Sequence, residues 1–287
     1  MVSLTHIALM VAVTAAGLAL GSFLNVVIYR LPREGLAIDR PRRSFCPICA
    51  AQISWRDNIP VISWLLLRGR CRSCQSPISF RYPLVELLAA LLAALAFQTE
   101  GVSIRFFITL YFLLCLVAIF FIDLEHLIIA DVLVIPTILL GVILAVVDPV
   151  PYLMGHGLWA YLVESGLSPR LVGLIGSVAG FVLGFGILWL ISALYKAWRG
   201  RAGLGDGDPP LLGLIGIYLG WLAIFPVLFL STAMGLLTVG FLVVTGRMSR
   251  EKIANQPIPF GPFLSLAAII WYFFGQSILT WYLNLFT

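Results

Sequence analysis

The sequence predicts an all-α polytopic membrane protein with about eight transmembrane helices. The first reason is composition: 61% of the 287 residues are hydrophobic, 11% are charged and the mean hydropathy is +1.05. Soluble domains carry about 25% charged residues, so a soluble fold is excluded. The second reason is that apolar runs near the roughly 20 residues needed to cross a bilayer alternate with short polar segments.

The basic residues predict which side of the membrane each polar segment occupies. Ten of the 18 lysines and arginines lie between Arg30 and Arg81, and such an excess marks the cytoplasmic side. This distribution, and not affinity for nucleic acid, explains the net charge of +5. Because basic residues follow the first apolar run and do not precede it, we expect a retained helix and not a cleaved signal peptide.

This reasoning gives a topology with both termini outside the cytoplasm and a tight reversal at Pro226. A long outer loop is expected over residues 148–169. The expected spans are residues 3–27, 83–97, 104–122, 132–147, 171–194, 211–224, 227–245 and 261–283. The later basic residues that support this orientation are Lys196, Arg199, Arg201, Arg247, Arg250 and Lys252.

The segment 30–82 is the one sizeable polar stretch, and it contains two Cys-x-x-Cys pairs. The pairs are Cys46 with Cys49 and Cys71 with Cys74. Two such pairs about 20 residues apart are typical of a tetrahedral zinc site. Two disulfides are the alternative, although they are rare in the cytoplasm. Four thiolates leave no open position for a substrate, so the zinc is expected to be structural.

Three features of the membrane border have two interpretations each. The basic loop with Trp55 and Trp64 fits either a platform on an anionic leaflet or a binding surface for an anionic ligand or substrate tail. Residues 21–25 fit either helix packing or a direct substrate role. Glu86 fits either a first-turn partner of its helix dipole or part of a site.

The strongest candidate for chemistry is a pair of aspartates. Asp123 ends one apolar run, and Asp208 lies in the glycine-rich stretch 203–210 before another. Carboxylates beside hydrocarbon are costly and usually functional. Two carboxylates that share a proton activate water against a carbonyl group. Asp208 before a proline also fits a helix cap, and spacing alone leaves Asp206, Glu125 and Asp131 as further candidates.

Together, these motifs resemble the prepilin peptidase family over nearly the whole chain. The resemblance rests on residues 21–32 (GSFLNVVIYRLP), the two cysteine pairs with the segment between them, residues 81–88 (RYPLVELL), residues 122–131, and the Gly-x-Gly-Asp motif at 205–208. It implies domains at 1–29 (first helix), 30–82 (zinc-binding) and 83–287 (peptidase), in the bacterial inner membrane with the active site and zinc loop in the cytoplasm.

The resemblance also implies an activity. Asp123 and Asp208 would form the dyad of an aspartic peptidase that cleaves type IV prepilins or type II pseudopilins after a glycine. The enzyme would then methylate the new N-terminal residue with S-adenosylmethionine, for which Gly69, Arg70 and Glu86 are candidate residues. One departure is Pro210, where family members commonly carry lysine.

Two other functions remain to be weighed against the peptidase. In a proton-coupled transporter the carboxylates would form a relay, but such proteins place them near mid-membrane, often with an inverted repeat. In a non-enzymatic scaffold of a secretion or pilus assembly, the zinc loop would be essential and the aspartates dispensable.

Overall fold

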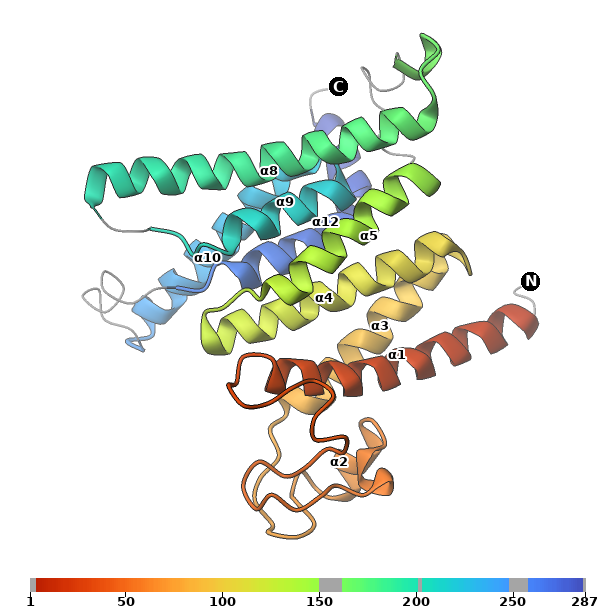
Figure 1. The fold of residues 1–287 in the computed structure, drawn as a ribbon, viewed down its shortest axis with the longest axis vertical. Coiled ribbons are helices and arrows are strands. Elements are labelled where there is room, and N and C mark those ends of the chain that lie inside the picture. Colours follow the sequence, from red (N-terminus) through yellow and green to blue (C-terminus); the bar gives the residue numbers. More distant parts are fainter. Residues whose placement is uncertain (1–3, 150–161, 201–202, 248–257, 286–287) are drawn as a thin grey trace. The chain divides into compact units, whose positions relative to one another are not determined.

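The computed structural model describes residues 4–149, 162–200, 203–247 and 258–285. Most of the predicted outer loop, together with Arg201, Arg250 and Lys252, lies outside the described residues. The described residues form helices and connecting turns, without a β-strand (Figure 1). The chain divides into two compact units, Met1–Ala118 and Ile119–Thr287.

The first unit contains two long helices with a compact loop between them. These are α1 (Leu4–Arg30) and α3 (Arg81–Glu100). The loop between them holds a short 3-10 helix, η1 (Trp55–Asn58), and a single short α-helix, α2 (Ile62–Leu66). Helix α4 (Ile104–His126) continues from this unit into the second.

The second unit is a group of apolar helices. In chain order its described elements are α5 (Asp131–Val147), α8 (Pro169–Arg199), α9 (Asp208–Leu219), η2 (Trp221–Ala223), α10 (Ile224–Val244) and α12 (Gly261–Leu283).

Each of the eight predicted spans coincides with a helix, but they are not all of spanning length. Six helical segments of the described residues are long and apolar enough to cross a membrane. Helices α5 and α9 are apolar but shorter, with 17 and 12 residues. The predicted reversal at Pro226 is wrong, because Pro226 lies in the first turn of α10 and the break occurs at Gly220, where φ is +81°.

Helices α1 and α3 pack closely through glycines. A Cβ at Gly17 would lie 2.7 Å from the Cα of Ala90, and one at Gly21 would lie 2.6 Å from the Cα of Glu86. Small residues of this kind let helix backbones approach in a membrane. The side chain of Asn25 extends the contact by donating to the carbonyl of Tyr82 at 3.0 Å. The helix-packing interpretation of residues 21–25 is therefore confirmed.

The last residue of α1 also fixes the start of the loop. Arg30 is 4% exposed, and its guanidinium donates to the carbonyls of Ile38 at 2.9 Å and Pro41 at 2.7 Å. A buried arginine whose donors meet backbone carbonyls avoids the cost of an unpaired charge. Arg30 thus folds the chain back before the first cysteine pair.

Helix α9 is buried, and its contact with α8 is unusually close. A Cβ at Gly180 would lie 2.1 Å from the carbonyl oxygen of Gly216, so neither position has room for a side chain. The hydroxyl of Ser177 donates to the carbonyl of Ile217 at 3.1 Å, and that of Tyr218 donates to the carbonyl of Thr137 at 3.0 Å. These contacts fix α9, and therefore its first residue, Asp208.

Candidate active site and metal centre

Asp123 lies near the C-terminal end of α4 and is buried. Its side chain is 5% exposed, and its Oδ2 accepts the backbone N–H of Gly261 at 3.0 Å. Gly261 is the first residue of α12. The first N–H groups of a helix lack partners within the helix and carry partial positive charge, so they stabilise a carboxylate.

Asp208 is the first residue of α9 and is also buried, with 4% exposure. Its Oδ2 accepts the backbone N–H of Gly205 at 3.0 Å, which folds the glycine-rich stretch back over the carboxylate. The cap position belongs to Gly207, and no side chain caps this helix. The alternative in which Asp208 is simply a helix cap is therefore wrong.

The two aspartates belong to one site in the second unit. An electrostatic interaction couples their carboxylates. The side chain of Ile129 lies beside one glycine near each acid: Gly207, which precedes Asp208 in the chain, and Gly261, which donates its N–H to Asp123. A Cβ at Gly207 would come within 2.6 Å of the Cβ of Ile129, and one at Gly261 would come within 3.2 Å of its Cδ1. The fold thus brings together two acids that are 85 residues apart.

Asp123 and Asp208 are buried, whereas the other carboxylates that sequence spacing left as catalytic candidates are not. Asp206, Glu125 and Asp131 are exposed. Asp131 is the first residue of α5, and the cap position there is Ala130. Only a buried carboxylate has the low-dielectric surroundings that strengthen its coupling to a neighbouring charge. The structure therefore favours Asp123 and Asp208 over these three.

Gly261 is the site residue that sequence reasoning missed. A Cβ at this position would lie 2.6 Å from the Oδ2 of Asp123, so only glycine fits where the helix begins. The signal in the sequence is the Gly-Pro pair at the start of the last apolar run, since proline is favoured in the first turn of a helix. Nothing in that local pattern indicates a partner 138 residues earlier.

The four cysteines of the first unit form one cluster. Their sulfur atoms all lie within 4.8 Å of one another, and the Sγ atoms of Cys46 and Cys74 are 3.9 Å apart. A tetrahedral zinc site with Zn–S bonds of about 2.3 Å places its sulfurs about 3.8 Å apart. A disulfide requires about 2.05 Å, and all four cysteines are free thiols. The cluster therefore fits a metal ion and not two disulfides.

The two cysteine pairs are presented by matching turns. The N–H of Cys46 donates to Ala51 and that of Cys71 donates to Ser76, both at 2.9 Å. In return, the carbonyls of the two cysteines accept from Ala50 and Gln75, which have φ values of +57° and +58°. Each turn aims two sulfurs in one direction, as a four-thiolate site requires.

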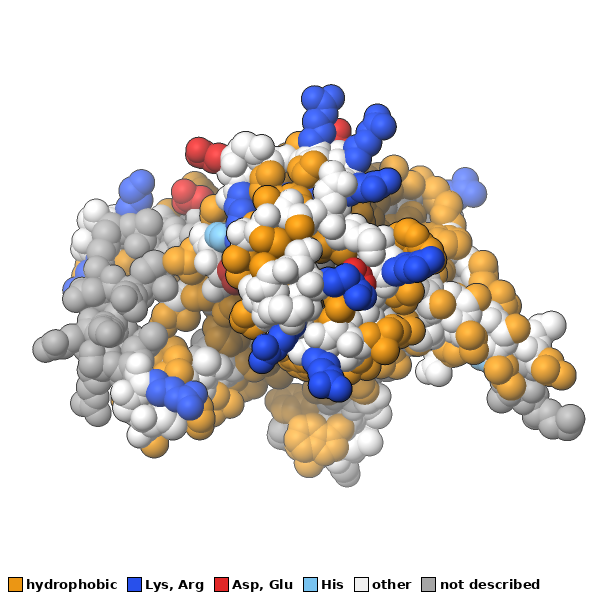
Figure 2. Space-filling model, turned by 90° about the horizontal axis from the view of Figure 1, so that it is seen from below, with side chains coloured by type: hydrophobic (Ala, Val, Ile, Leu, Met, Phe, Trp, Pro, Cys, Tyr) orange, Lys and Arg blue, Asp and Glu red, His pale blue; other side chains and the backbone are white. Residues whose placement is uncertain are grey.

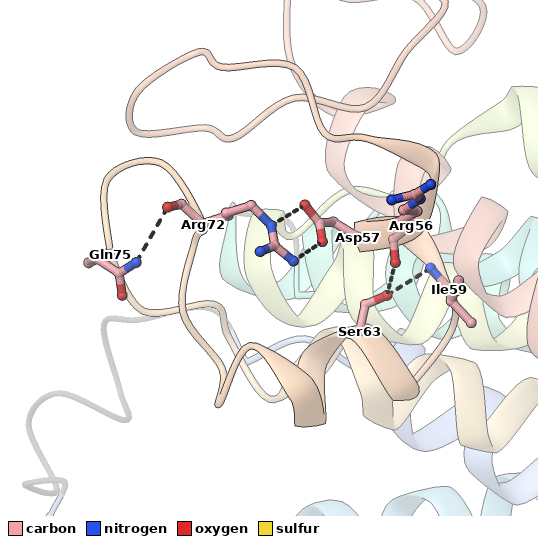
Figure 3. Close-up of polar contacts among 6 residues, drawn as sticks. All are labelled: Arg56, Asp57, Ile59, Ser63, Arg72 and Gln75. Carbon is pink, nitrogen blue, oxygen red and sulfur yellow. Dashed lines mark hydrogen bonds and ion pairs between the residues drawn. The ribbon is translucent and has the colours of Figure 1, made fainter.

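An ion pair ties the second turn to the segment between the pairs. Arg72 donates to both carboxylate oxygens of Asp57, at 2.8 and 2.7 Å, as Figure 3 shows. These hydrogen bonds lower the pKa of Asp57 from its ordinary value. The bidentate geometry holds η1 against the Cys71–Cys74 turn.

The three candidates for methyl transfer lie in the first unit. Gly69 has φ +66° and packs against Trp64, since a Cβ there would lie 3.0 Å from the indole ring. Arg70 is exposed. Glu86 is buried, and its carboxylate accepts the backbone N–H of Val61 at 2.7 Å. Because α3 begins at Arg81, Glu86 lies in the second turn, and the first-turn interpretation is wrong.

Comparison with known proteins identifies the family to which this chain belongs. Residues 15–99 match the Bacterial Peptidase A24 N-terminal domain, and residues 110–240 match the Type IV leader peptidase family. A curated relative from Aeromonas hydrophila is 37% identical over 94% of this chain and 92% of its own length. This chain belongs to the type IV leader peptidase family.

Three curated relatives from different bacteria carry the same name. The Aeromonas hydrophila protein is a prepilin leader peptidase/N-methyltransferase. So are relatives from Pseudomonas aeruginosa and Neisseria gonorrhoeae, each 33% identical, which cover 93% and 92% of this chain and 91% and 90% of their own lengths. No solved structure matches the chain.

Pro210, two residues after Asp208, has a structural consequence for the start of α9. Asp208, Pro209 and Pro210 form the first turn of α9. Prolines are tolerated there because the first N–H groups of a helix have no partner within it. The position therefore offers rigidity at the helix start and no ammonium group beside Asp208.

Proposed function

We propose that this chain removes the leader peptides of type IV prepilins or type II pseudopilins and then methylates the new N-terminal residue. The observation that carries the proposal is the pair of buried carboxylates, Asp123 and Asp208, which meet at helix ends in a chain of this family. The names of the relatives support both activities.

In the proposed reaction the two carboxylates share one proton. The ionised carboxylate takes a proton from water as the water oxygen attacks the scissile carbonyl carbon, and the protonated one donates to the carbonyl oxygen. Collapse of the tetrahedral intermediate breaks the C–N bond, and the leaving amine receives a proton. The products are a shortened pilin with a free amine and a leader with a new carboxylic acid.

The backbone around the dyad suits this chemistry. Gly261 donates one N–H to the Oδ2 of Asp123, and Gly205 donates one to the Oδ2 of Asp208, so the Oδ1 of each carboxylate is left for water or substrate. The absence of a side chain at Gly205, where a Cβ would lie 3.3 Å from the Oδ2 of Asp208, lets a peptide backbone approach this carboxylate closely, whereas the space at Gly207 is filled by Ile129. Such positioning contributes to catalysis by holding reacting groups in place.

The four cysteines, Cys46, Cys49, Cys71 and Cys74, would hold a structural zinc ion. Bound zinc supplies a cross-link between the two cysteine turns and, with four thiolate ligands, no open coordination position. We assign residues 30–82 as the zinc-binding domain, residues 1–29 as the first membrane helix and residues 83–287 as the peptidase domain.

S-adenosylmethionine would supply the methyl group for the second activity. Gly69 and Arg70 fit a binding role, because the Trp64 ring lies beside Gly69 and the Arg70 side chain is exposed. Glu86 fits a supporting role, since its carboxylate already holds the loop at Val61. Arg70→Ala should therefore reduce methylation while leader cleavage continues.

We propose a topology of eight helices embedded in the bacterial inner membrane, with the dyad and the zinc loop on the cytoplasmic side. The concentration of arginines between Arg30 and Arg81 supports this orientation. Helix α9, with 12 residues, is about 18 Å long and would be embedded over only part of the roughly 30 Å hydrocarbon core.

The test uses the full-length protein in lipid with a prepilin-type substrate. Mass spectrometry should show loss of the leader and, with S-adenosylmethionine, a gain of one methyl group on the new N-terminus. Asp123→Asn and Asp208→Asn should each prevent cleavage. A scaffold or a transporter would leave the substrate intact with the wild-type chain as well, and that result would overturn the proposal.

A further inference from the structure

Helix α2 has its polar side chain inside and three of its four apolar side chains outside. Ser63 is 6% exposed, whereas Ile62, Leu65 and Leu66 are 54%, 61% and 78% exposed. A helix that faces water normally shows the opposite pattern, because burial of apolar surface is what holds it to its neighbours. The outward face of α2 therefore suits apolar surroundings.

Hydrogen bonds fix this orientation. The hydroxyl of Ser63 donates to the carbonyl of Arg56 and accepts the N–H of Ile59, both at 2.9 Å, and Figure 3 shows it lying between these groups. The indole N–H of Trp64 donates to the carbonyl of Ile78 at 3.1 Å. Turning α2 over would break these bonds, so the outward direction of the leucines is set by the loop itself.

The loop is held against a membrane helix at this point. Val61, directly before α2, donates its N–H to the carboxylate of Glu86 at 2.7 Å. Glu86 lies five residues inside α3, or about 7 Å along it. At the other end of the loop, the ring of Phe80 contacts that of Trp64 with centroids 5.8 Å apart. The start of α2 therefore lies level with the first turns of a candidate span.

The apolar face extends beyond α2 and belongs to a segment with an excess of positive charge. Phe80, directly before α3, is 61% exposed. Residues 54–80 contain one acidic residue, Asp57, which pairs with Arg72. The exposed arginines of the same stretch are Arg56, Arg68, Arg70 and Arg72. Figure 2 shows Lys and Arg side chains interspersed with hydrophobic ones on the face seen from below.

We infer that Ile62, Leu65, Leu66 and Phe80, which together we call the α2 face, form a lipid anchor that inserts into the headgroup boundary of an anionic leaflet. Apolar side chains level with the first turns of a membrane helix meet the acyl chains, and the arginines around them meet anionic headgroups. The anchor holds the four-cysteine loop to the membrane surface, in addition to the covalent links through α1 and α3.

A photo-crosslinking probe tests this inference in the full-length protein. Benzoylphenylalanine is placed at Leu66 in nanodiscs of phosphatidylcholine with phosphatidylglycerol. We expect lipid adducts by mass spectrometry. Ile48 is the matched control, because it is apolar, 67% exposed and located in the first cysteine turn. Its probe should give several-fold fewer adducts. Adducts of Leu66 with protein, of this chain or another, or equal lipid labelling at both positions, would overturn the inference.

Hydrogen exchange tests the role of charge. Amide exchange over residues 62–67 should be slower in nanodiscs that contain phosphatidylglycerol than in phosphatidylcholine alone. The double variant Arg56→Gln, Arg68→Gln should lose this difference while its metal content stays unchanged. Equal exchange in the two lipids for the wild-type chain would contradict an anionic partner.

A second variant tests insertion. Leu65→Ser combined with Leu66→Ser should speed amide exchange over residues 62–67 in both lipids, and unchanged exchange would contradict insertion.

Discussion

The Asp123–Asp208 site and the four-cysteine loop differ in what holds their functional atoms in place. Both aspartates are buried, each accepts one backbone N–H, and each lies at the end of a helix that tertiary packing fixes. In the loop, Cys49 and Cys74 are exposed, and the scaffold consists of two turns, an ion pair and short helices. The comparison teaches that helix packing positions the acids, whereas two hydrogen-bonded turns and an ion pair position the sulfurs.

The largest expected effect comes from removing cysteine ligands, which should disrupt the four-cysteine loop and leave the membrane helices intact. Cys46→Ser and Cys71→Ser should abolish tight metal binding, because structural zinc sites contribute about 10–16 kcal/mol of binding free energy that is also folding free energy. Metal analysis and hydrogen exchange over the loop would measure this. Cys115→Ser is the control, since Cys115 is buried in α4 outside the cluster. Undiminished metal in the Cys46 variant would contradict a four-thiolate site.

The next largest effect should appear at the dyad with the metal retained. Asp123→Asn and Asp208→Asn should each lower the cleavage rate by about 10²–10⁴-fold, the usual contribution of a general acid or base. Asp206→Asn is the matched control, because Asp206 is exposed on the same glycine-rich stretch. A similar loss in the Asp206 variant would show that the loop, and not the buried pair, carries the sensitivity.

A smaller effect should follow from adding one carbon beside Asp123. Gly261→Ala would place a Cβ 2.6 Å from the Oδ2 of Asp123 and displace that carboxylate. Misplacement of a catalytic group by about 1 Å costs about 10²-fold, so kcat should fall by about 10–10²-fold with little change in KM. Gly240→Ala, where nothing lies within 4 Å of the new Cβ, should be neutral. Equal activity of the two variants would remove Gly261 from the site.

The smallest effect concerns the ion pair of the loop. Hydrogen bonds from Arg72 lower the pKa of Asp57, so the ionised carboxylate stabilises the folded loop above its unfolded pKa of about 3.9. This contribution is lost as the pH falls through the lower folded value. Arg72→Gln should raise the pKa of Asp57 toward the unfolded value, measured by NMR with labelled aspartate. Arg68→Gln, which removes a different exposed arginine, should leave that midpoint in place.

The sequence predicted the helices because hydropathy is a local property, and it predicted the cysteine cluster because ligand spacing is local too. The break at Gly220 escaped prediction, since the apolar run continues across it and a φ of +81° leaves no mark on hydropathy. The link between Asp123 and Gly261 escaped for a different reason. It depends on which helix ends meet, and no pattern in either segment encodes the other.

The glycine crossing of α8 and α9 bears on how a substrate reaches the acids. At Gly180 and Gly216 the two backbones touch without intervening side chains, and sliding either helix would drive carbonyl groups into the opposing chain. The two helices should therefore move together, so Asp208, at the start of α9, should keep its position relative to α8. Adjustment of the site to a substrate is then expected at Asp123 and Gly261, which come from other helices.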